Sequence, residues 1–322
     1  MHSHASLRTP TPRRDASPTT DEDQLVLALD PQRGIFAGLD SLASPDPRLP
    51  VAVRGRLVGP VFEWPRVVYG RGATGSDALV SVVSAAFEQL ALATLAGRRV
   101  IGGTIMGTGA HTSIDAAQVL AHGALGCGAE LAGAGEHALL EACERRAVER
   151  AWASGGLEGR LDDRAEPTAV ADVLHWHRGR GCRVVSLLLG REPPVVACVA
   201  LPFDDDAPAL VGVAAARTAA GAWRSAATEL HASYLARGQG ARGGGLRERH
   251  GGNPRGRVLT VGRDHAIARI ALDTAVARTR RSIELSTIAP WPRPIPAVAV
   301  EITPPIAATF GRKVVAAVLA TD

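Results

Sequence analysis

The sequence predicts a mixed α/β (α+β) fold in which long helices pack against mixed sheets. Between about Gln24 and residue 70, short β-rich segments are separated by Pro and Gly, a pattern typical of strands joined by tight turns. Beyond Gly155 the pattern alternates between strands and helices. With 322 residues, of which 46% are hydrophobic, the chain is long and apolar enough to form a sizeable core.

The N-terminal half is predicted to contain strands followed by two long helices. Residues 1–23 have the composition of a disordered tail, and residues 24–322 are predicted to form a single domain. The first long helix opens with Ser76 and Asp77, which are typical capping residues. The elements predicted in this half are strands at 25–29, 51–58, 66–69 and 99–105, and helices at 76–96, 112–120 and 136–152.

The C-terminal half is predicted to alternate between helices and strands. Residues 123–135, before the central helix, are too rich in Gly and Ala to be assigned. Residues 238–258 are predicted to form a mobile loop because their Gly- and Arg-rich composition offers little to bury. The elements predicted here are helices at 169–178, 222–236, 264–282 and 305–309, and strands at 182–189, 195–201, 297–302 and 313–319.

The composition excludes several classes of protein. The arginines are mostly dispersed and aromatic residues make up only 4% of the chain, so we expect no nucleic-acid partner despite the net charge of +4. No segment of about 18 uninterrupted apolar residues occurs, so we expect no membrane partner. The N-terminus carries no apolar secretion signal. Four cysteines without a Cys-x-x-Cys spacing are expected to be buried free thiols in the cytoplasm.

Two weaker motifs have simpler interpretations. Gly70-x-Gly72-x-x-Gly75 matches a dinucleotide fingerprint, but the next predicted strand lacks the acidic residue that would bind the ribose. His175 and His177 lack a third metal ligand at a suitable spacing. Neither motif therefore predicts a site.

Glutamates on three predicted helices form the strongest candidate site. Glu141, Glu144 and Arg145 share one face of the central helix. Taken alone, such a group is most often a solvated ion pair. Glu88 and Glu229 lie on two other predicted helices. Neighbouring buried carboxylates repel unless cations neutralise them, and Mg2+ prefers oxygen ligands, so these glutamates would suit a Mg2+–ATP site. Spacing alone does not bring the three helices together.

Three blocks of residues resemble the motifs of the YcaO family. The similarity covers about residues 25–320 and is closest to the standalone or D-type members, which modify ribosomally made peptides. The first block comprises Gly70, Arg71, Gly72, Ser81 and Glu88; the second comprises Glu141, Glu144 and Arg145; the third comprises Gly212, Ala222, Ala226 and Glu229. The chain therefore resembles a divergent member of this family.

The resemblance implies a YcaO-like fold, ATP and Mg2+ as cofactors, and a cytoplasmic role in the biosynthesis of a peptide natural product. Family members use ATP to activate a backbone amide oxygen, so that a Cys, Ser or Thr side chain, sulfide or an amine attacks the amide carbon. Azolines, which lead to thiazole or oxazole rings, thioamides or amidines result. The implied partner is a ribosomally made precursor peptide. A leader-binding partner protein and a homodimer are left open.

By the same resemblance, the glutamates would hold Mg2+ and two other residues would lie near the phosphates. This arrangement stabilises phosphoryl transfer by electrostatics. The implied metal ligands are Glu88, Glu141, Glu144 and Glu229, and the implied phosphate neighbours are Ser81 and Arg145.

Four departures from the family pattern keep a second function open. Ala85 replaces a metal-binding Glu, Gly123 replaces an Asn, Gln89 replaces an Arg, and Ala232 replaces a Gln. Loss of a carboxylate lowers the negative charge that attracts Mg2+. The alternative is a catalytically inactive YcaO-like scaffold or partner protein in the same pathway.

Overall fold

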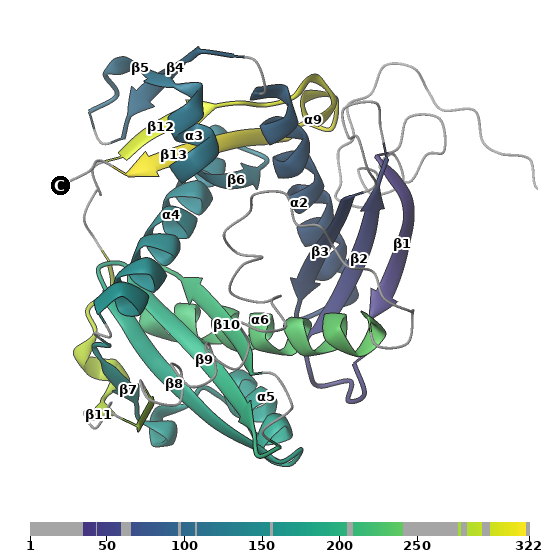
Figure 1. Ribbon diagram of the computed structural model, residues 1–322, viewed down its shortest axis with the longest axis vertical. Helices are drawn as coiled ribbons and strands as arrows, with labels where there is room; N and C mark the ends of the chain where they lie inside the picture. Colours follow the sequence, from purple (N-terminus) through teal and green to yellow (C-terminus); the bar gives the residue numbers. More distant parts are fainter. Residues whose placement is uncertain are drawn as a thin grey trace, which may run out of the picture.

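The structure is a computed structural model of the chain. It describes residues 35–42, 44–58, 66–95, 98–106, 108–154, 157–204, 209–240, 276–277, 282–291 and 297–319. Within these residues the chain forms three sheets, and Figure 1 shows them arranged with long helices around the centre of the molecule.

The first sheet has three antiparallel strands in the order β1-β2-β3. The strands are β1 (Phe36–Leu42), β2 (Val51–Leu57) and β3 (Arg66–Gly72). β3 leads directly into the long helix α2 (Gly75–Leu95). Thr74 and Asp77 exchange hydrogen bonds at the first turn of α2, which satisfies backbone donors that the helix leaves free.

The second sheet has five antiparallel strands in the order β5-β4-β12-β13-β6. The strands are β4 (Val100–Ile105), β5 (His111–Asp115), β6 (Ala124–Gly128), β12 (Ala297–Glu301) and β13 (Lys313–Leu319). Two short helices, α3 (Ala116–His122) and α9 (Pro305–Thr309), connect its strands. The edge strand β6 precedes the long helix α4 (Leu131–Ser154), which packs across β6 and β13.

The third sheet has five strands in the order β10-β9-β8-β7-β11. Its strands are β7 (Gly159–Leu161), β8 (Cys182–Arg191), β9 (Pro194–Pro202), β10 (Leu210–Ala215) and β11 (Ser282–Ile283). Of the described strand pairs in this sheet, β7 and β11 are parallel and the others are antiparallel. Helix α5 (Thr168–Arg178) covers β8, while the edge strand β10 precedes the long helix α6 (Ala219–Gly240).

The three long helices border the centre of the molecule. Figure 1 shows α2, α4 and α6 as three sides of a triangle, with one sheet associated with each side. Each helix packs most extensively on the edge strand that precedes it: α2 on β3, α4 on β6 and α6 on β10. Three successive strand–helix units therefore set the positions of the predicted carboxylates.

Apolar side chains of α2 form the centre of the largest hydrophobic cluster. Val82, Phe87 and Leu95 are fully buried there, and the ring of Phe87 packs against that of Phe310. By length and composition α2 would also pass as a membrane-spanning helix. A buried core helix passes the same test, so this observation is weak evidence for a membrane, and the absence of a membrane partner stays a prediction.

Most predicted elements are confirmed within the described residues. The helices predicted at 76–96, 136–152, 169–178 and 222–236 correspond to α2, α4, α5 and α6, each with ends shifted by a few residues. All four cysteines are free, as predicted, and three of them are buried while Cys182 is half-buried. The single-domain organisation and the cytoplasmic location stay predictions.

The structure corrects the prediction at several places. The predicted helix at 112–120 is wrong in its first half, because β5 runs to Asp115 and α3 starts only at Ala116. The unassigned segment 123–135 contains β6 and the first turn of α4, and the prediction also lacked β1, β7, β10 and β11. Helix α6 continues to Gly240, into the predicted loop. The tail 1–23, the strand at 25–29, the remaining loop residues and nearly all of the helix predicted at 264–282 lie outside the described residues, and Ser282 at the end of that predicted helix begins β11.

Candidate active site

A glycine in each edge strand lets the long helix approach closely. We call Gly70 in β3, Gly126 in β6 and Gly212 in β10 the docking glycines. A Cβ atom added at any of them would lie closer than 3.0 Å to backbone atoms of the helix that follows. The backbone of each long helix therefore rests directly on its strand, and the close contact fixes which helix face points toward the rest of the site.

Glu141 and Arg145 form the most buried part of the candidate site. Glu141 is only 8% exposed, and Arg145 Nη2 donates a hydrogen bond of 2.6 Å to its Oε1 atom. Arg145 Nη1 donates a second hydrogen bond, of 2.7 Å, to the carbonyl oxygen of Gly123. The pair is therefore held against the start of β6, and it is not the solvated surface pair that such a group most often forms.

Glu229 meets an arginine from the first sheet. Its carboxylate oxygen Oε2 lies 3.0 Å from Arg71 Nη2, and the Glu229 side chain is 16% exposed. The same Oε2 atom is buried and accepts no hydrogen bond of good geometry within the described residues. The contact is thus an ion pair that leaves the carboxylate able to accept a further ligand.

Glu88 and Ser81 lie on α2, and Glu88 is close to β6. Burial raises the pKa of the Cys127 thiol in β6 to about 12, and the negative charge of Glu88 adds to that increase. Helix α2 also contacts β6 directly. Ser81 and Glu88 are both half-buried, as is Glu144 on α4. The structure therefore brings Glu88 of the first unit against a strand of the second.

The donor set partly fits the predicted cofactors. Carboxylate oxygens are the ligands that Mg2+ prefers, and the guanidinium groups of Arg71 and Arg145 are suited to phosphate oxygens. Buried polar atoms without hydrogen-bond partners, Glu229 Oε2 and Arg145 Nε, are consistent with an additional ligand. Among the described residues, however, no group of three or more acidic, His or Cys side chains is close enough to hold a metal ion as the protein stands.

One departure from the family pattern has a local structural reason. A Cβ atom at Gly123 would lie closer than 3.0 Å to the carbonyl oxygen of Val119, to which the Gly123 N–H group donates a hydrogen bond. An Asn side chain at this position would require the turn between α3 and β6 to shift. The backbone conformation of this turn therefore accommodates Gly123 but leaves no space for the side chain of an Asn.

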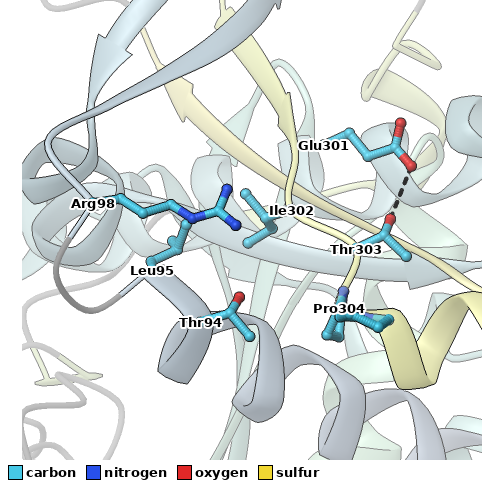
Figure 2. Close-up of a pocket in the computed structure, with 8 residues that line it drawn as sticks. Thr94, Leu95, Arg98, Glu301, Ile302, Thr303 and Pro304 are labelled. Carbon is cyan, nitrogen blue, oxygen red and sulfur yellow. Dashed lines mark hydrogen bonds between the residues drawn. The ribbon is translucent and has the colours of Figure 1, made fainter.

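A separate cavity lies at the far end of α2. It has a volume of about 470 Å³ and lies between the last turn of α2 and the segment from β12 to α9. Figure 2 shows Arg98 reaching over it and Glu301 hydrogen-bonded to Thr303. Glu301 is also paired with Lys313, which lowers the pKa of its carboxyl group. None of the six predicted site residues lines this cavity.

The prediction from sequence assigned no role to Arg71. The residue lies inside the Gly70-Arg71-Gly72 block, between the two glycines that match the family motif. Its position between two glycines of the motif is the feature of the sequence that could have identified Arg71 as a site residue. Its contact with Glu229 joins two of the strand–helix units through a predicted metal ligand.

A comparison of the sequence with family models decides the family. The model that describes YcaO cyclodehydratases binding ATP and Mg2+ matches residues 122–301, more than half of the chain. The chain belongs to the YcaO family. The matched region contains α4 and α6, whereas α2 precedes it. The family is thus an ATP- and Mg2+-binding one, as the resemblance implied.

Solved structures of similar fold include other YcaO proteins. A heterocyclase in complex with substrate and cofactor superposes with a TM-score of 0.70 at 13% identity, covering 95% of this chain and 54% of that one. YcaO from Methanopyrus kandleri, bound with AMPPCP and Mg2+, gives 0.64 at 14% identity, with coverages of 88% and 85%. The Escherichia coli microcin synthetase McbBCD complex with pro-MccB17 bound gives 0.63 at 11% identity, with coverages of 88% and 87%.

These similarities confirm the predicted fold class. The YcaO protein spans about half the length of the heterocyclase and most of the length of the other two chains. At such low identity the superpositions show the fold alone. No curated protein matches the sequence.

Proposed function

We propose that this YcaO protein uses ATP and Mg2+ to activate a backbone amide of a ribosomally made precursor peptide. The observation that carries the proposal is the placement of Glu141, Glu144 and Arg145 on α4, partly buried and inside the region that the family model matches. Carboxylates and a guanidinium with so little access to water suit a polyphosphate and its cation better than bulk solvent.

Each predicted site residue has a role in this proposal. Mg2+ would neutralise charge on the transferred phosphoryl group. The guanidinium groups of Arg71 and Arg145, together with the hydroxyl of Ser81, would orient the phosphates of the substrate ATP. Glutamates from all three long helices would hold the cation, namely Glu88, Glu141, Glu144 and Glu229.

The finer reaction is proposed from the family and its neighbours. The heterocyclase contains substrate and cofactor, and McbBCD contains pro-MccB17, so a peptide substrate and a partner protein are reasonable for this chain. The product is an azoline, which leads to thiazole or oxazole, or else a thioamide or amidine. A cytoplasmic location and a homodimer belong to the same proposal.

Calorimetric titration with ATP tests the proposal. We expect binding that requires Mg2+ and weakens about tenfold or more in Glu141→Gln, because the amide keeps the hydrogen bond to Arg145 but removes the charge. Glu149→Gln is the matched control, since Glu149 lies exposed on the same helix. Equal binding by Glu141→Gln and wild type would place the nucleotide elsewhere, and absence of Mg2+-dependent binding by the wild type would overturn the proposed function.

The alternative is an inactive scaffold that serves a catalytic partner. Two observations favour it: Ala85 removes one carboxylate from α2, and Arg71 already neutralises Glu229. In that case ATP would not bind, and a precursor peptide or partner YcaO protein would bind with the same affinity to wild type and Glu141→Gln. Tight peptide binding without nucleotide binding would decide for the scaffold.

A further inference from the structure

We infer that the three strand–helix units are equivalent copies arranged in a closed ring, and that Arg237 positions Glu229 in the third copy. The units are β3–α2, β6–α4 and β10–α6. The bearing of Arg237 on nucleotide binding rests on the proposed function, whereas the equivalence of the units rests on contacts within the protein.

The first observation is that each docking glycine contacts an equivalent pair of backbone atoms on its own helix. A Cβ at Gly70, Gly126 or Gly212 would collide with the carbonyl oxygen of one helix residue and the amide nitrogen of the residue four positions later. These atoms belong to the two ends of one helical hydrogen bond. The pairs are Ala78 and Val82, Ala134 and Ala138, and Ala226 and Leu230. Among the residues that the structure describes, all three strands also lie at the edge of a sheet and pair with one antiparallel neighbour.

This contact defines a common numbering for the three helices. Counted from the residue that supplies the amide nitrogen, positions −1, +3, +6 and +7 lie on one side of a helix. The residues there are Ser81, Ala85, Glu88 and Gln89 in α2; His137, Glu141, Glu144 and Arg145 in α4; and Glu229, Ser233, Ala236 and Arg237 in α6. All six residues predicted for the site occupy these positions, although the numbering comes from backbone contacts alone.

The two arginines at position +7 make the same contact. Arg145 Nη1 donates to the carbonyl oxygen of Gly123, three residues before its docking glycine. Arg237 Nη2 donates, over 3.3 Å, to the carbonyl oxygen of Ala209, which is also three residues before its docking glycine. Both hydrogen bonds tie the helix to the start of its own strand, so each arginine limits rotation of its helix.

The first unit makes a corresponding link, but here the donor belongs to the strand and the acceptor to the helix. Gln89, at position +7 of α2, accepts a hydrogen bond of 3.0 Å from Arg66 Nη1. Arg66 is four residues before Gly70, at the first residue of β3. All three units therefore tie the same helix position to the start of the strand.

The contacts between units close the ring. α2 contacts β6, α4 contacts β10, and α6 contacts β3. The residue after a docking glycine faces the neighbouring helix in two of these contacts: Arg71 pairs with Glu229, and the charge of Glu88 raises the pKa of Cys127. At these two contacts a carboxylate of one unit, Glu229 at position −1 of α6 or Glu88 at position +6 of α2, lies beside the strand of another unit.

Arg237 follows Glu229 by about two helical turns on the same side of α6. Rotation or fraying of α6 after loss of the hydrogen bond to Ala209 would move the Glu229 carboxylate relative to Arg71. Arg237 is therefore a positioning residue that acts through Glu229, rather than a ligand of the nucleotide.

The test compares Arg237→Ala and Arg237→Lys with Arg224→Ala, a control that removes an exposed charge from the same helix. We expect Arg237→Ala to weaken Mg2+-dependent ATP binding about tenfold, in line with a hydrogen bond from a charged group, and Arg237→Lys to restore part of it. In a Glu229→Gln background, Arg237→Ala should change the affinity less than about twofold, because Arg237 acts through that carboxylate.

Hydrogen exchange of the ligand-free protein provides the second readout. Arg237→Ala should accelerate exchange of α6 amides relative to wild type and to Arg224→Ala. Unchanged exchange, or an equal loss of affinity with and without Glu229, would overturn the inference. If wild type binds no Mg2+–ATP, the proposed function fails, and faster exchange in Arg237→Ala alone would still support the equivalence of the units.

Discussion

The guanidinium of Arg71 lies 3.0 Å from the carboxylate of Glu229, although 157 residues lie between them in the sequence. Arg71 belongs to the first strand–helix unit and Glu229 to the third. Both side chains are at least partly shielded from water, so the pair is stronger than an ordinary surface ion pair. Removal of either side chain should therefore change how the site binds ions.

Arg71→Ala should have opposite effects on a bare cation and on a nucleotide. Without the guanidinium, Arg71 no longer competes with a cation for the Glu229 carboxylate, so Mg2+ alone should raise the melting temperature more than it does in wild type. ATP should bind more weakly because a group that pairs with phosphate is lost. Thermal melts with and without MgCl2, followed by titration with ATP, measure both effects. Arg54→Ala is the control because Arg54 pairs with Asp40 on the first sheet. Equal responses of the two variants to Mg2+ would contradict this prediction.

A methyl group at a docking glycine should be strongly destabilising. Gly126→Ala would place a Cβ against the backbone of Ala134 and Ala138, and such overpacking costs about 2–3 kcal/mol. Gly133→Ala, on the helix that Gly126 contacts, has open space around its Cβ and should stabilise the protein by up to about 1 kcal/mol. Urea unfolding of both variants measures the difference. Similar unfolding midpoints would show that α4 does not depend on close contact with β6.

Two buried histidines should make the folded protein less stable in acid. Burial lowers the pKa of His177 to about 3 and that of His231 to about 4, from the usual value of 6.5. Above pH 6.5 both histidines are neutral in the folded and in the unfolded chain, so they do not lower the free energy of unfolding there. As the pH falls from 6.5 toward 4, the unfolded chain binds protons that the folded chain does not. The free energy of unfolding should therefore decrease by about 2–3 kcal/mol between about pH 7.5 and 5.5.

His231→Gln tests the origin of that decrease. The amide can still interact with the Ser44 hydroxyl, which lies 3.2 Å from His231 Nε2, but it does not titrate. The variant should lose about half of the pH dependence. Denaturant unfolding at several pH values is the measurement, and an unchanged slope in His231→Gln would assign the effect to other groups.

The cysteines should differ in reactivity in the folded protein. Burial raises the thiol pKa of Cys127 and Cys198 to about 12 and that of Cys143 to about 11. Cys182 is half-buried, with a smaller increase of its pKa. Iodoacetamide at about pH 8 should therefore modify Cys182 first, and peptide mass mapping over time can follow the order. Rapid modification of Cys127 would show that β6 separates easily from α2.

The sequence predicted the helices of the candidate site better than the strands that hold them. Helices α2, α4 and α6 carry long amphipathic or apolar patterns, and these survive in a single sequence. Strands β6 and β10 are short and contain docking glycines, which lower the propensity for strands and resemble loop residues. The glycines allow close contact with the helix backbone. This contact is tertiary, so a local sequence pattern does not reveal it.

The equivalence of the three units was also hidden from the sequence. The copies share a glycine in the strand and an alanine carbonyl at the helix contact, but few other identical residues. Ala85 and Glu141 occupy the same place, as do Gln89 and Arg145. The family motifs identified the helix positions of the glutamates, but only the tertiary contacts reveal Arg71 and Arg237.

The ring closes through contacts between α6 and the first sheet, and this has a consequence for synthesis of the chain. Leu235 packs with Leu42 and Ala52, so a core that begins in β1 and β2 is completed only by α6. At about 5–20 residues per second, a ribosome needs roughly 10–30 s to proceed from the end of β3 to the end of α6. The face of the first sheet that receives α6 therefore stays exposed to water during that interval, and a nascent chain interrupted before Glu229 has no means of covering it.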